Sequence, residues 1–434
     1  MTTTANLRGQ KIVLAFSGGL DTSFCVAWLT QDQGAEVITV CVDTGGFDEA
    51  GLAAIEARAL ELGSLEHHTV DARAEVFDRF VSYVVKGGVL RGGVYPVSVA
   101  AERTAQTEAV VAVALSMGAD AVAHGSTGAG NDQIRFDVAM ATLAPGLSIV
   151  APVRDLGWSR QQEAAWLAEH SVAQPAAEVA YSRNAGLVGA TIGGIETHDS
   201  WSMPPESVYE LTVDRDTEIE AEELLLDFEE GLPTKLDGRV MAGHTMLAEL
   251  NRRAGAHGFG RGVHVGDTIL GVKGRIAFEA PGSLLLVKAH GELAKLVQTR
   301  MQSHWNNQLG DFWGEQLHQG LFYDPAMRDA EALLDSSSTL VTGQVKLLLH
   351  RGHGDVVGVR SPHSLLGGQG AVYGEEMGTW TGAEAAGFAR LHGLQCVLAA
   401  SRDRAQAAAG ESVKQTVTAT EQSATDTLSG EAGA

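Results

Sequence analysis

The chain has 434 residues, of which 44% are hydrophobic, so its length and composition favour two or three domains with substantial cores. Its 31 basic and 54 acidic residues give a formal charge of −23, which repels polyanions and argues against a nucleic-acid partner. No apolar stretch reaches the roughly 18 residues that a membrane span needs, and the short polar start lacks a signal peptide. The cysteines, Cys25, Cys41 and Cys396, form no local metal or redox pair, so we expect a reduced, cytoplasmic protein.

A glycine-rich loop joins the first two predicted elements, a strand over 11–16 and a helix over 22–33. Glycines let a phosphate approach the backbone, and the N–H groups at a helix N-terminus attract anions. The Gly-Lys-Ser/Thr ending of a Walker A loop is missing. The run instead resembles the pyrophosphate loop of enzymes that split ATP into AMP and pyrophosphate; an ordinary strand-to-helix turn is the alternative. The residues concerned are Ala15, Phe16, Ser17, Gly18, Gly19, Leu20, Asp21, Thr22 and Ser23.

The first 175 residues alternate between strand and helix patterns. This alternation predicts an α/β fold, a doubly wound parallel sheet whose ligands lie at the carboxyl ends of its strands. We therefore expect a nucleotide-binding domain over residues 1–175. Its further strands are predicted over 36–42, 65–70, 119–125 and 147–151, and its further helices over 49–62, over 98–117 and after Ser159 as N-cap.

A second cluster of glycines and polar residues follows the strand predicted at 119–125. Within nine residues, Thr127, Asn131, Asp132 and Arg135 present a hydroxyl, an amide, a carboxylate and a guanidinium. A zwitterionic amino acid needs both charges, since a guanidinium pairs with its carboxylate and a carboxylate with its ammonium. The cluster indicates an amino-acid site; a solvated turn before an ordinary helix is the alternative.

The pattern changes after Pro175 to a mixture typical of an α+β domain, which we place at 176–380. A last helix is predicted over 381–401, and the Ala-, Ser- and Thr-rich tail, 402–434, is expected to be disordered. Within the second domain, alternating segments lie at 208–213 and 223–228, helical patterns at 239–254, 281–302 and 325–335, and a hairpin at 341–360.

Three stretches together resemble the argininosuccinate synthase family. They are the loop from Ala15 to Ser23, the run from His124 to Phe136, and the pair Tyr181-Ser182. The resemblance implies an adenine nucleotide alpha hydrolase-like domain, a synthetase domain and a homotetramer. It also implies that ATP, with Mg²⁺, drives the joining of citrulline to aspartate through a citrullyl-adenylate, giving argininosuccinate, AMP and pyrophosphate.

The resemblance also implies roles for individual residues. ATP would contact the loop from Ala15 to Ser23, Val42 and Gly125. Aspartate would contact Thr127, Asn131 and Asp132, and citrulline would contact Tyr95, Ser98, Asn131, Arg135, Ser182 and Thr191. Asp21 and Asp132 are candidate catalytic residues that act mainly by positioning; Asp21 could orient the loop, act through metal-bound water or cap the helix. No metal site built from protein side chains is expected.

Three positions depart from the family pattern. Gly266 stands where the family commonly has a citrulline-contacting Glu, Phe278 where it has Tyr, and Ala129 where it frequently has Lys. Asp267, next to Gly266, could substitute for the missing Glu. These departures leave two alternatives open, another adenylating ligase of the same loop class and a non-catalytic ligand-binding relative.

Overall fold

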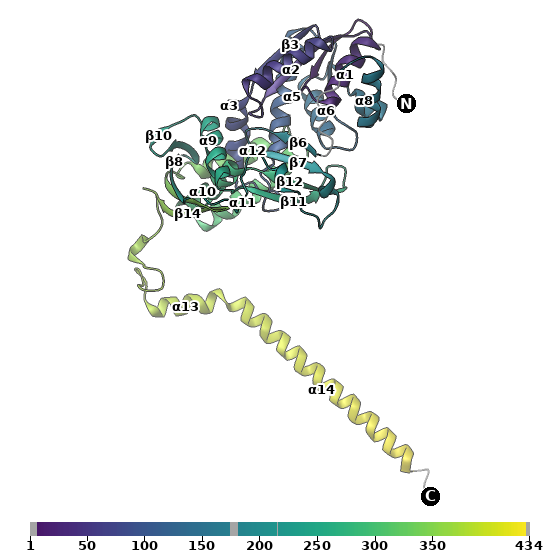
Figure 1. Ribbon diagram of the computed structural model, residues 1–434. Helices are drawn as coiled ribbons and strands as arrows, with labels where there is room; N and C mark the ends of the chain where they lie inside the picture. The colour runs from purple at the N-terminus through teal and green to yellow at the C-terminus, as the bar shows by residue number, and fades with distance from the viewer. Residues whose placement is uncertain (1–6, 174–180, 215, 431–434) are drawn as a thin grey trace. The chain divides into compact units, whose positions relative to one another are not determined.

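The computed structural model describes residues 7–173, 181–214 and 216–430. The chain divides into two compact units, residues 1–364 and 365–434, which are described separately. The first unit begins with a parallel sheet in the order β3-β2-β1-β4-β5, which confirms the α/β prediction. Its edge strand β3 lies beside helix α2 (Figure 1). Its strands are β1 Lys11–Ala15, β2 Glu36–Asp43, β3 Glu66–Asp71, β4 Ala121–Ala123 and β5 Ser148–Val150.

Helices cover both faces of this sheet because its buried strands are apolar on both sides. Ile12 and Leu14 of β1 pack with helices α1, α2, α7 and α8, whereas Val13 packs with α5 and α6 on the opposite face. Alternate residues of a strand point to opposite faces, so one short strand contributes to two cores. The helices are α1 Leu20–Gln31, α2 Glu49–Glu61, α5 Ser98–Ser116, α6 Asp132–Leu143, α7 Pro152–Leu156 and α8 Arg160–Glu169.

The strand order reverses between β1 and β4, which lie side by side in parallel. In an open α/β sheet, ligands bind outside the carboxyl ends of the strands at this switch point. The glycine-rich loop after β1 and the polar cluster after β4 therefore leave the sheet next to each other.

The second half of this unit contains two antiparallel sheets, in the orders β10-β9-β8-β13-β14 and β11-β12-β7-β6. The first confirms the strand expected near 223–228 and the hairpin expected at 341–360. The strands are β6 Tyr181–Ala185, β7 Ala190–Gly194, β8 Glu222–Glu229, β9 Leu232–Leu236, β10 Arg239–Val240, β11 Arg261–Asp267, β12 Lys273–Glu279, β13 Gly343–His350 and β14 His353–Arg360.

Four long helices pack with these sheets around the largest core, in which Trp313 and Phe322 are buried. These helices are α9 Gly243–Ala256, α10 Pro281–Val297, α11 Arg300–His318 and α12 Pro325–Ser338. Helix α10 also packs on α4 of the first half. The shorter helices are α3 Arg73–Val76, η1 Phe77–Val81, α4 Ser82–Lys86, η2 Ile195–His198, η3 Glu206–Val208 and, in the second unit, η4 Gly368–Gly370.

Two expectations for this half were wrong. The helix predicted over 281–302 is two helices, because Thr299 and Gln302 form a capping box that starts α11. The alternating segment 208–213 is not a strand. Its backbone N–H groups at Glu210, Leu211 and Thr212 donate to the buried carboxylate of Glu279 at 2.8–3.0 Å, so they are not available for a strand ladder.

Besides η4, the described part of the second unit contains the α-helices α13 Gly382–His392 and α14 Leu394–Gly430. The single helix expected over 381–401 is thus interrupted at Gly393, and most of the tail expected to be disordered is helical. The tail contains few residues that could form a core, but it is rich in alanine, which has the highest intrinsic helix propensity. This composition favours a helix. Residues 431–434 lie outside the described part.

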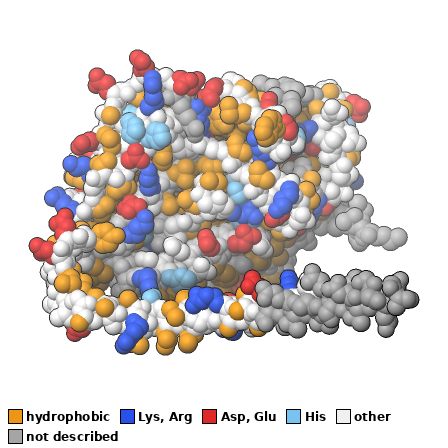
Figure 2. Space-filling model, turned by 90° about the horizontal axis from the view of Figure 1, so that it is seen from below, with side chains coloured by type: hydrophobic (Ala, Val, Ile, Leu, Met, Phe, Trp, Pro, Cys, Tyr) orange, Lys and Arg blue, Asp and Glu red, His pale blue; other side chains and the backbone are white. Residues whose placement is uncertain are grey.

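None of the helices in the described ranges is long and apolar enough to cross a bilayer. Acidic and basic side chains are interspersed over the face of the molecule that Figure 2 shows, and neither sign gathers into one large area there. That face offers no broad cationic surface of the kind that tracks a phosphate backbone.

Candidate functional site

The loop between β1 and α1 has the backbone geometry that the sequence predicted. Gly18 has φ +76°, a conformation that L side chains rarely adopt, and a Cβ atom there would lie 3.2 Å from Ile55. Gly19 caps α1 without a side-chain hydrogen bond, so no side chain occupies the N-terminal N–H groups. The Ser17 and Thr22 hydroxyls lie 3.3 Å apart and stabilise the turn. The loop presents a helix N-terminus to an anion.

The second loop packs directly on the first. A Cβ atom on Gly125 would lie 3.1 Å from Cγ2 of Thr22 and 3.3 Å from the carbonyl carbon of Asp21. The two loops are therefore in contact, as their positions at neighbouring strand ends require. Val42, the other residue expected at the adenosine, is the penultimate residue of β2, and its side chain is buried in the core, so only its backbone is left for a ligand.

His124 holds the start of the second loop. Its Nδ1 atom accepts a hydrogen bond from the Ser126 N–H at 3.2 Å, so its Nε2 atom carries the proton and donates to Asp137 at 2.9 Å. Asp137 is also paired with Arg154, whose side chain lies beside Gly128. The imidazole thus anchors the glycine-rich segment to α6.

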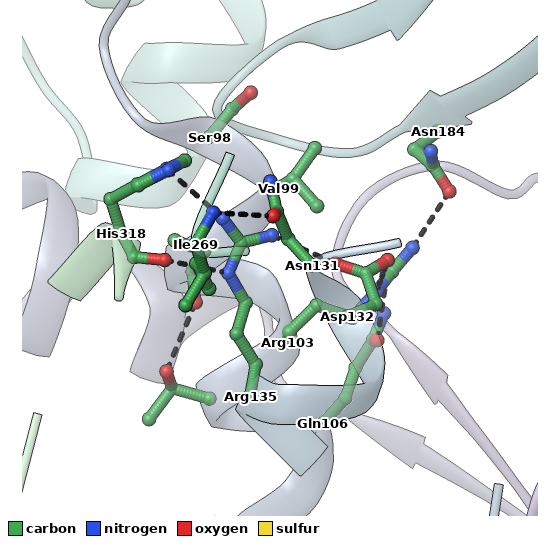
Figure 3. A network of polar contacts seen from close by, with 12 residues as sticks. Ser98, Val99, Arg103, Gln106, Asn131, Asp132, Arg135, Asn184, Ile269 and His318 are labelled. Atoms are coloured by element: carbon green, nitrogen blue, oxygen red, sulfur yellow. Dashed lines mark hydrogen bonds and ion pairs between the residues drawn. The ribbon is translucent and has the colours of Figure 1, made fainter. Parts of the chain in front are cut away.

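A charged network lies at the start of α6 (Figure 3). One oxygen of Asp132 accepts from Arg135 at 2.8 Å and the other from Arg103 of α5 at 2.9 Å. Arg103 also donates to Asn184 of β6 at 2.7 Å. Burial acts to raise the pKa of the Asp132 carboxyl, but the two guanidinium groups outweigh it and hold that pKa below its usual value. Asp132 is therefore an ionised carboxylate at neutral pH.

Arg135 is almost fully buried and makes contacts that the sequence did not indicate. It donates to the backbone oxygen and to the ring Nδ1 of His318, both at 3.0 Å (Figure 3). Burial and the charges of Arg135 and Arg91 lower the pKa of His318 to about 3, so its ring is a neutral acceptor. Asn131 accepts from the Ile269 N–H at 2.9 Å. The first turn of α6 is thus anchored to the second half of the unit.

Tyr95 and Ser98 lie together at the start of α5. Their hydroxyls are 3.0 Å apart and both side chains are buried. Val97, which lies between them in the sequence, has φ +47°, a value that is rare for a β-branched residue. This backbone turn directly precedes α5. The Tyr95 ring stacks on His264 of β11 and packs against Phe278 of β12.

The predicted residues Ser182 and Thr191 share one face of the sheet β11-β12-β7-β6, whereas Thr127 lies in the loop between β4 and α6. Ser182 and Asn184 are two residues apart on β6, and Thr191 lies opposite both Asn184 and Phe278 in the ladder. Ser182 lines a pocket of about 380 Å³ with Arg160 and Arg275. Arg160 of α8 lies 3.4 Å from Asp21, so this pocket borders the first loop.

Comparison with known proteins identifies the family. The family model described as "Arginosuccinate synthase N-terminal HUP domain" matches residues 11–173. A second model, described as "Arginosuccinate synthase C-terminal domain", matches residues 181–399. The argininosuccinate synthase of Xanthomonas campestris is 40% identical over 403 residues, covering 92% of this chain and 100% of that protein. The argininosuccinate synthase of Staphylococcus saprophyticus is 36% identical and that of Methanocaldococcus jannaschii is 37% identical. Each alignment covers 89% of this chain, and the two cover 96% and 97% of the respective relative.

The chain belongs to the argininosuccinate synthase family. It is accordingly a member of a family of ATP-dependent ligases, and it matches the models of both the N-terminal and the C-terminal domain of that family. The resemblance drawn from three short motifs is confirmed over about nine tenths of the chain.

Neighbouring side chains occupy the space beside Gly266, the position at which the family commonly has Glu. A Cβ atom there would lie 2.6 Å from Nε2 of His264 and 3.0 Å from a guanidinium nitrogen of Arg91. These two side chains thus fill the place of a larger residue. Asp267 does not substitute, because it faces the other side of β11 and its carboxylate pairs with Lys273 at 2.6 Å. The expectation for Asp267 was wrong because adjacent strand residues point in opposite directions.

The sequence missed several residues that complete the site. Arg103, Asn184 and His318 are joined to Asp132 and Arg135 only by the fold, and no local motif marks them. The i, i+4 spacing did place Asn131 and Arg135 at the same helix start. Across the described residues, no group of three or more His, Cys, Asp or Glu side chains is arranged to hold a metal ion.

Proposed function

We propose that this chain condenses citrulline with aspartate at the expense of ATP, giving argininosuccinate, AMP and pyrophosphate. The observation that carries the proposal is the match of both domains to argininosuccinate synthase, together with the contact between the two glycine-rich loops at the switch point. The family suggests the reaction, and the contact between the loops supports a common site for the reactants.

ATP binds across the two loops in this proposal. The pyrophosphate part lies on the loop from Ala15 to Ser23, where the N-terminus of α1 stabilises the charge that develops as pyrophosphate leaves. Adenosine lies against Gly125 and the backbone of Val42. Mg²⁺ enters as part of the MgATP substrate and spreads the charge of the leaving pyrophosphate.

The amino acids bind around the start of α6. Aspartate takes Thr127, Asn131 and Asp132, and the ionised Asp132 carboxylate receives its ammonium. Citrulline takes Arg135 for its carboxylate. The further citrulline residues are Tyr95, Ser98, Asn131, Ser182 and Thr191. Ligands then compete with the present partners of Asp132 and Arg135, which are Arg103, His318 and each other.

The mechanism follows from the need to convert the ureido oxygen of citrulline into a good leaving group. A ureido oxygen leaves poorly, so it first attacks the α-phosphorus of ATP; the P–O bond to pyrophosphate breaks and a citrullyl-adenylate forms. The aspartate amine then attacks the ureido carbon and expels AMP. No side chain acts as nucleophile, and Asp21 and Asp132 act by positioning. Correct alignment of bound reactants can lower a barrier by about 7–11 kcal/mol.

An isotope experiment tests this proposal. Citrulline labelled with ¹⁸O in its ureido group is incubated with the purified protein, MgATP and aspartate. The label is expected in the phosphate of AMP, because the ureido oxygen leaves on that phosphorus. Pyrophosphate release should require citrulline. Release without citrulline, or unlabelled AMP alongside product, contradicts the mechanism; no release with any ureido acceptor favours the ligand-binding alternative.

The assembly and the location of the protein are also proposals. The family suggests a homotetramer, and the reduced cysteines, of which Cys25 and Cys41 are buried, suit the cytoplasm. Light scattering on the purified full chain should give four times the mass of one chain. A stable monomer or dimer at working concentration would contradict the tetramer.

A further inference from the structure

A buried carboxyl group that the mechanism does not use lies behind the first loop. Glu163 of α8 has no exposed surface, and neither of its carboxyl oxygens accepts a hydrogen bond within the described residues. Oδ1 of Asp21 is likewise buried and accepts no hydrogen bond, although Nε of Arg160 lies 3.4 Å from it as an ion-pair partner. The two carboxyl groups lie within hydrogen-bonding reach of each other. Two ionised carboxylates cannot bond, because both only accept.

The groups around Glu163 supply little compensation for a second negative charge. From α1 it faces Asp21 and the thiol of Cys25, which is itself buried. On its own helix the nearest cation is Arg160, which lies 3.4 Å from Asp21 and is about half exposed. One half-exposed guanidinium thus serves both carboxyl groups, so a single negative charge is the balanced state of the pair.

We propose that Glu163 is a positioning residue that holds a proton and donates a hydrogen bond to Asp21, so that the carboxyl pair beneath the pyrophosphate loop carries one negative charge. The inference rests on the proposed function, since it concerns how this loop receives ATP. A neutral Glu163 fixes the Asp21 side chain at the first turn of α1. It also keeps a second anion away from the place where the triphosphate binds.

The direction of titration agrees with this geometry. Burial, followed by the charge of Asp21 and the hydrogen bond between them, raises the pKa of Glu163 to about 8. The carboxyl group is therefore protonated at neutral pH and loses its proton as the pH rises through 8. Above that pH the pair carries two negative charges, which repel each other and the phosphates of ATP.

The experiment measures ATP binding by calorimetry and KM for ATP from below to above pH 8, using the full chain. In the wild type the Kd and KM for ATP are expected to rise above pH 8, by up to about tenfold per pH unit for one linked proton. Glu163→Gln keeps an N–H donor at every pH, so this rise should disappear. The control Glu169→Gln changes an exposed residue of the same helix and should retain the wild-type profile.

Infrared spectroscopy of the wild type detects the protonated carboxyl group directly, without enzymatic turnover. Burial also raises the pKa of Glu102 to about 8, so the readout is the difference between the two proteins. Infrared difference spectra across pH 8 should show a larger loss of protonated-carboxyl C=O intensity in the wild type than in Glu163→Gln. A flat wild-type binding profile, or an equal loss of C=O intensity in the wild type and in Glu163→Gln, overturns the inference. Failure to form argininosuccinate while the pH-dependent ATP binding and this spectral difference are present overturns the proposed function alone.

Discussion

Asp132 and Arg135 form an ion pair of 2.8 Å across one turn of α6, although each is proposed to bind a different substrate. Each therefore compensates the charge of the other while the site is open. Substrate carboxylate and ammonium groups can replace these contacts one for one, which keeps the buried charges paired throughout binding. A substitution at Arg135 should therefore change KM for citrulline most, and a substitution at Asp132 should change KM for aspartate most.

Arg135→Ala should impair the use of citrulline far more than the binding of ATP. A charge-assisted hydrogen bond contributes about 1.5–3 kcal/mol, so KM for citrulline should rise roughly 10- to 150-fold. Steady-state kinetics and calorimetric titration with ATP measure the two quantities. The exposed Arg300→Ala serves as the matched control. An equal loss of ATP affinity in a folded variant would contradict the assignment.

Asp132→Asn should weaken aspartate selectively. The amide keeps the shape but removes the charge that faces Arg103 and Arg135, so the aspartate ammonium loses its partner. We expect KM for aspartate to rise about 10- to 150-fold on the same energetic argument, with KM for ATP changed little. The exposed Asp311→Asn is the control. An unchanged KM for aspartate would show that this carboxylate does not bind it.

Gly18→Ala should weaken ATP binding through the backbone. At φ +76° a side chain costs about 1–2 kcal/mol, and the new methyl group would press on Ile55 at 3.2 Å. Gly118→Ala is the matched control, because it has φ +60° and open space around it. Both variants should lose comparable stability in thermal unfolding, but only Gly18→Ala should lose ATP affinity. Equal ATP affinity in the two variants would argue against a role for this loop.

His290 should make the protein less stable in mild acid. The side chain is buried in α10, and burial, followed by the charge of Lys86, lowers its pKa from 6.5 to about 4. As the pH falls from 6.5 toward 4, the unfolded chain takes up a proton that the folded chain excludes, so stability falls by up to about 3 kcal/mol. Above pH 6.5 this effect is absent.

Urea unfolding of the wild type and of His290→Leu at pH 7 and at pH 5 measures this linkage. The wild type should lose about 2 kcal/mol more than the variant between these two pH values. An equal loss in both proteins would mean that other groups set the acid sensitivity. The comparison uses the difference between the two pH values, so a constant effect of the substitution on packing cancels.

The first half of the fold could be predicted because its signals are local. Buried strands, glycine loops and caps such as Ser159 are readable over a few residues, and β1 and α8 begin where these signals place them. The sheet of β6, β7, β11 and β12 was not predicted. Its strands are rich in glycine and polar residues, and they form a sheet through long-range pairing, as between Phe278 and Thr191.

The candidate site divides in the same way. The two glycine-rich loops were predicted because each is a continuous motif. The contacts of Arg135 with His318, and of Asp132 with Arg103, join residues that only the tertiary fold brings together. Similarly, Arg91 and His264 at the place of the missing Glu could not be foreseen from Gly266 itself.

The contact of Gly125 with Asp21 and Thr22 has a consequence for mutational tolerance. Any side chain at position 125 pushes on the opposite loop, so even alanine alters a segment about a hundred positions away along the chain. A saturation library at this position should therefore yield almost no active clones, while second-site suppressors should gather at Thr22, where a smaller residue restores the lost space.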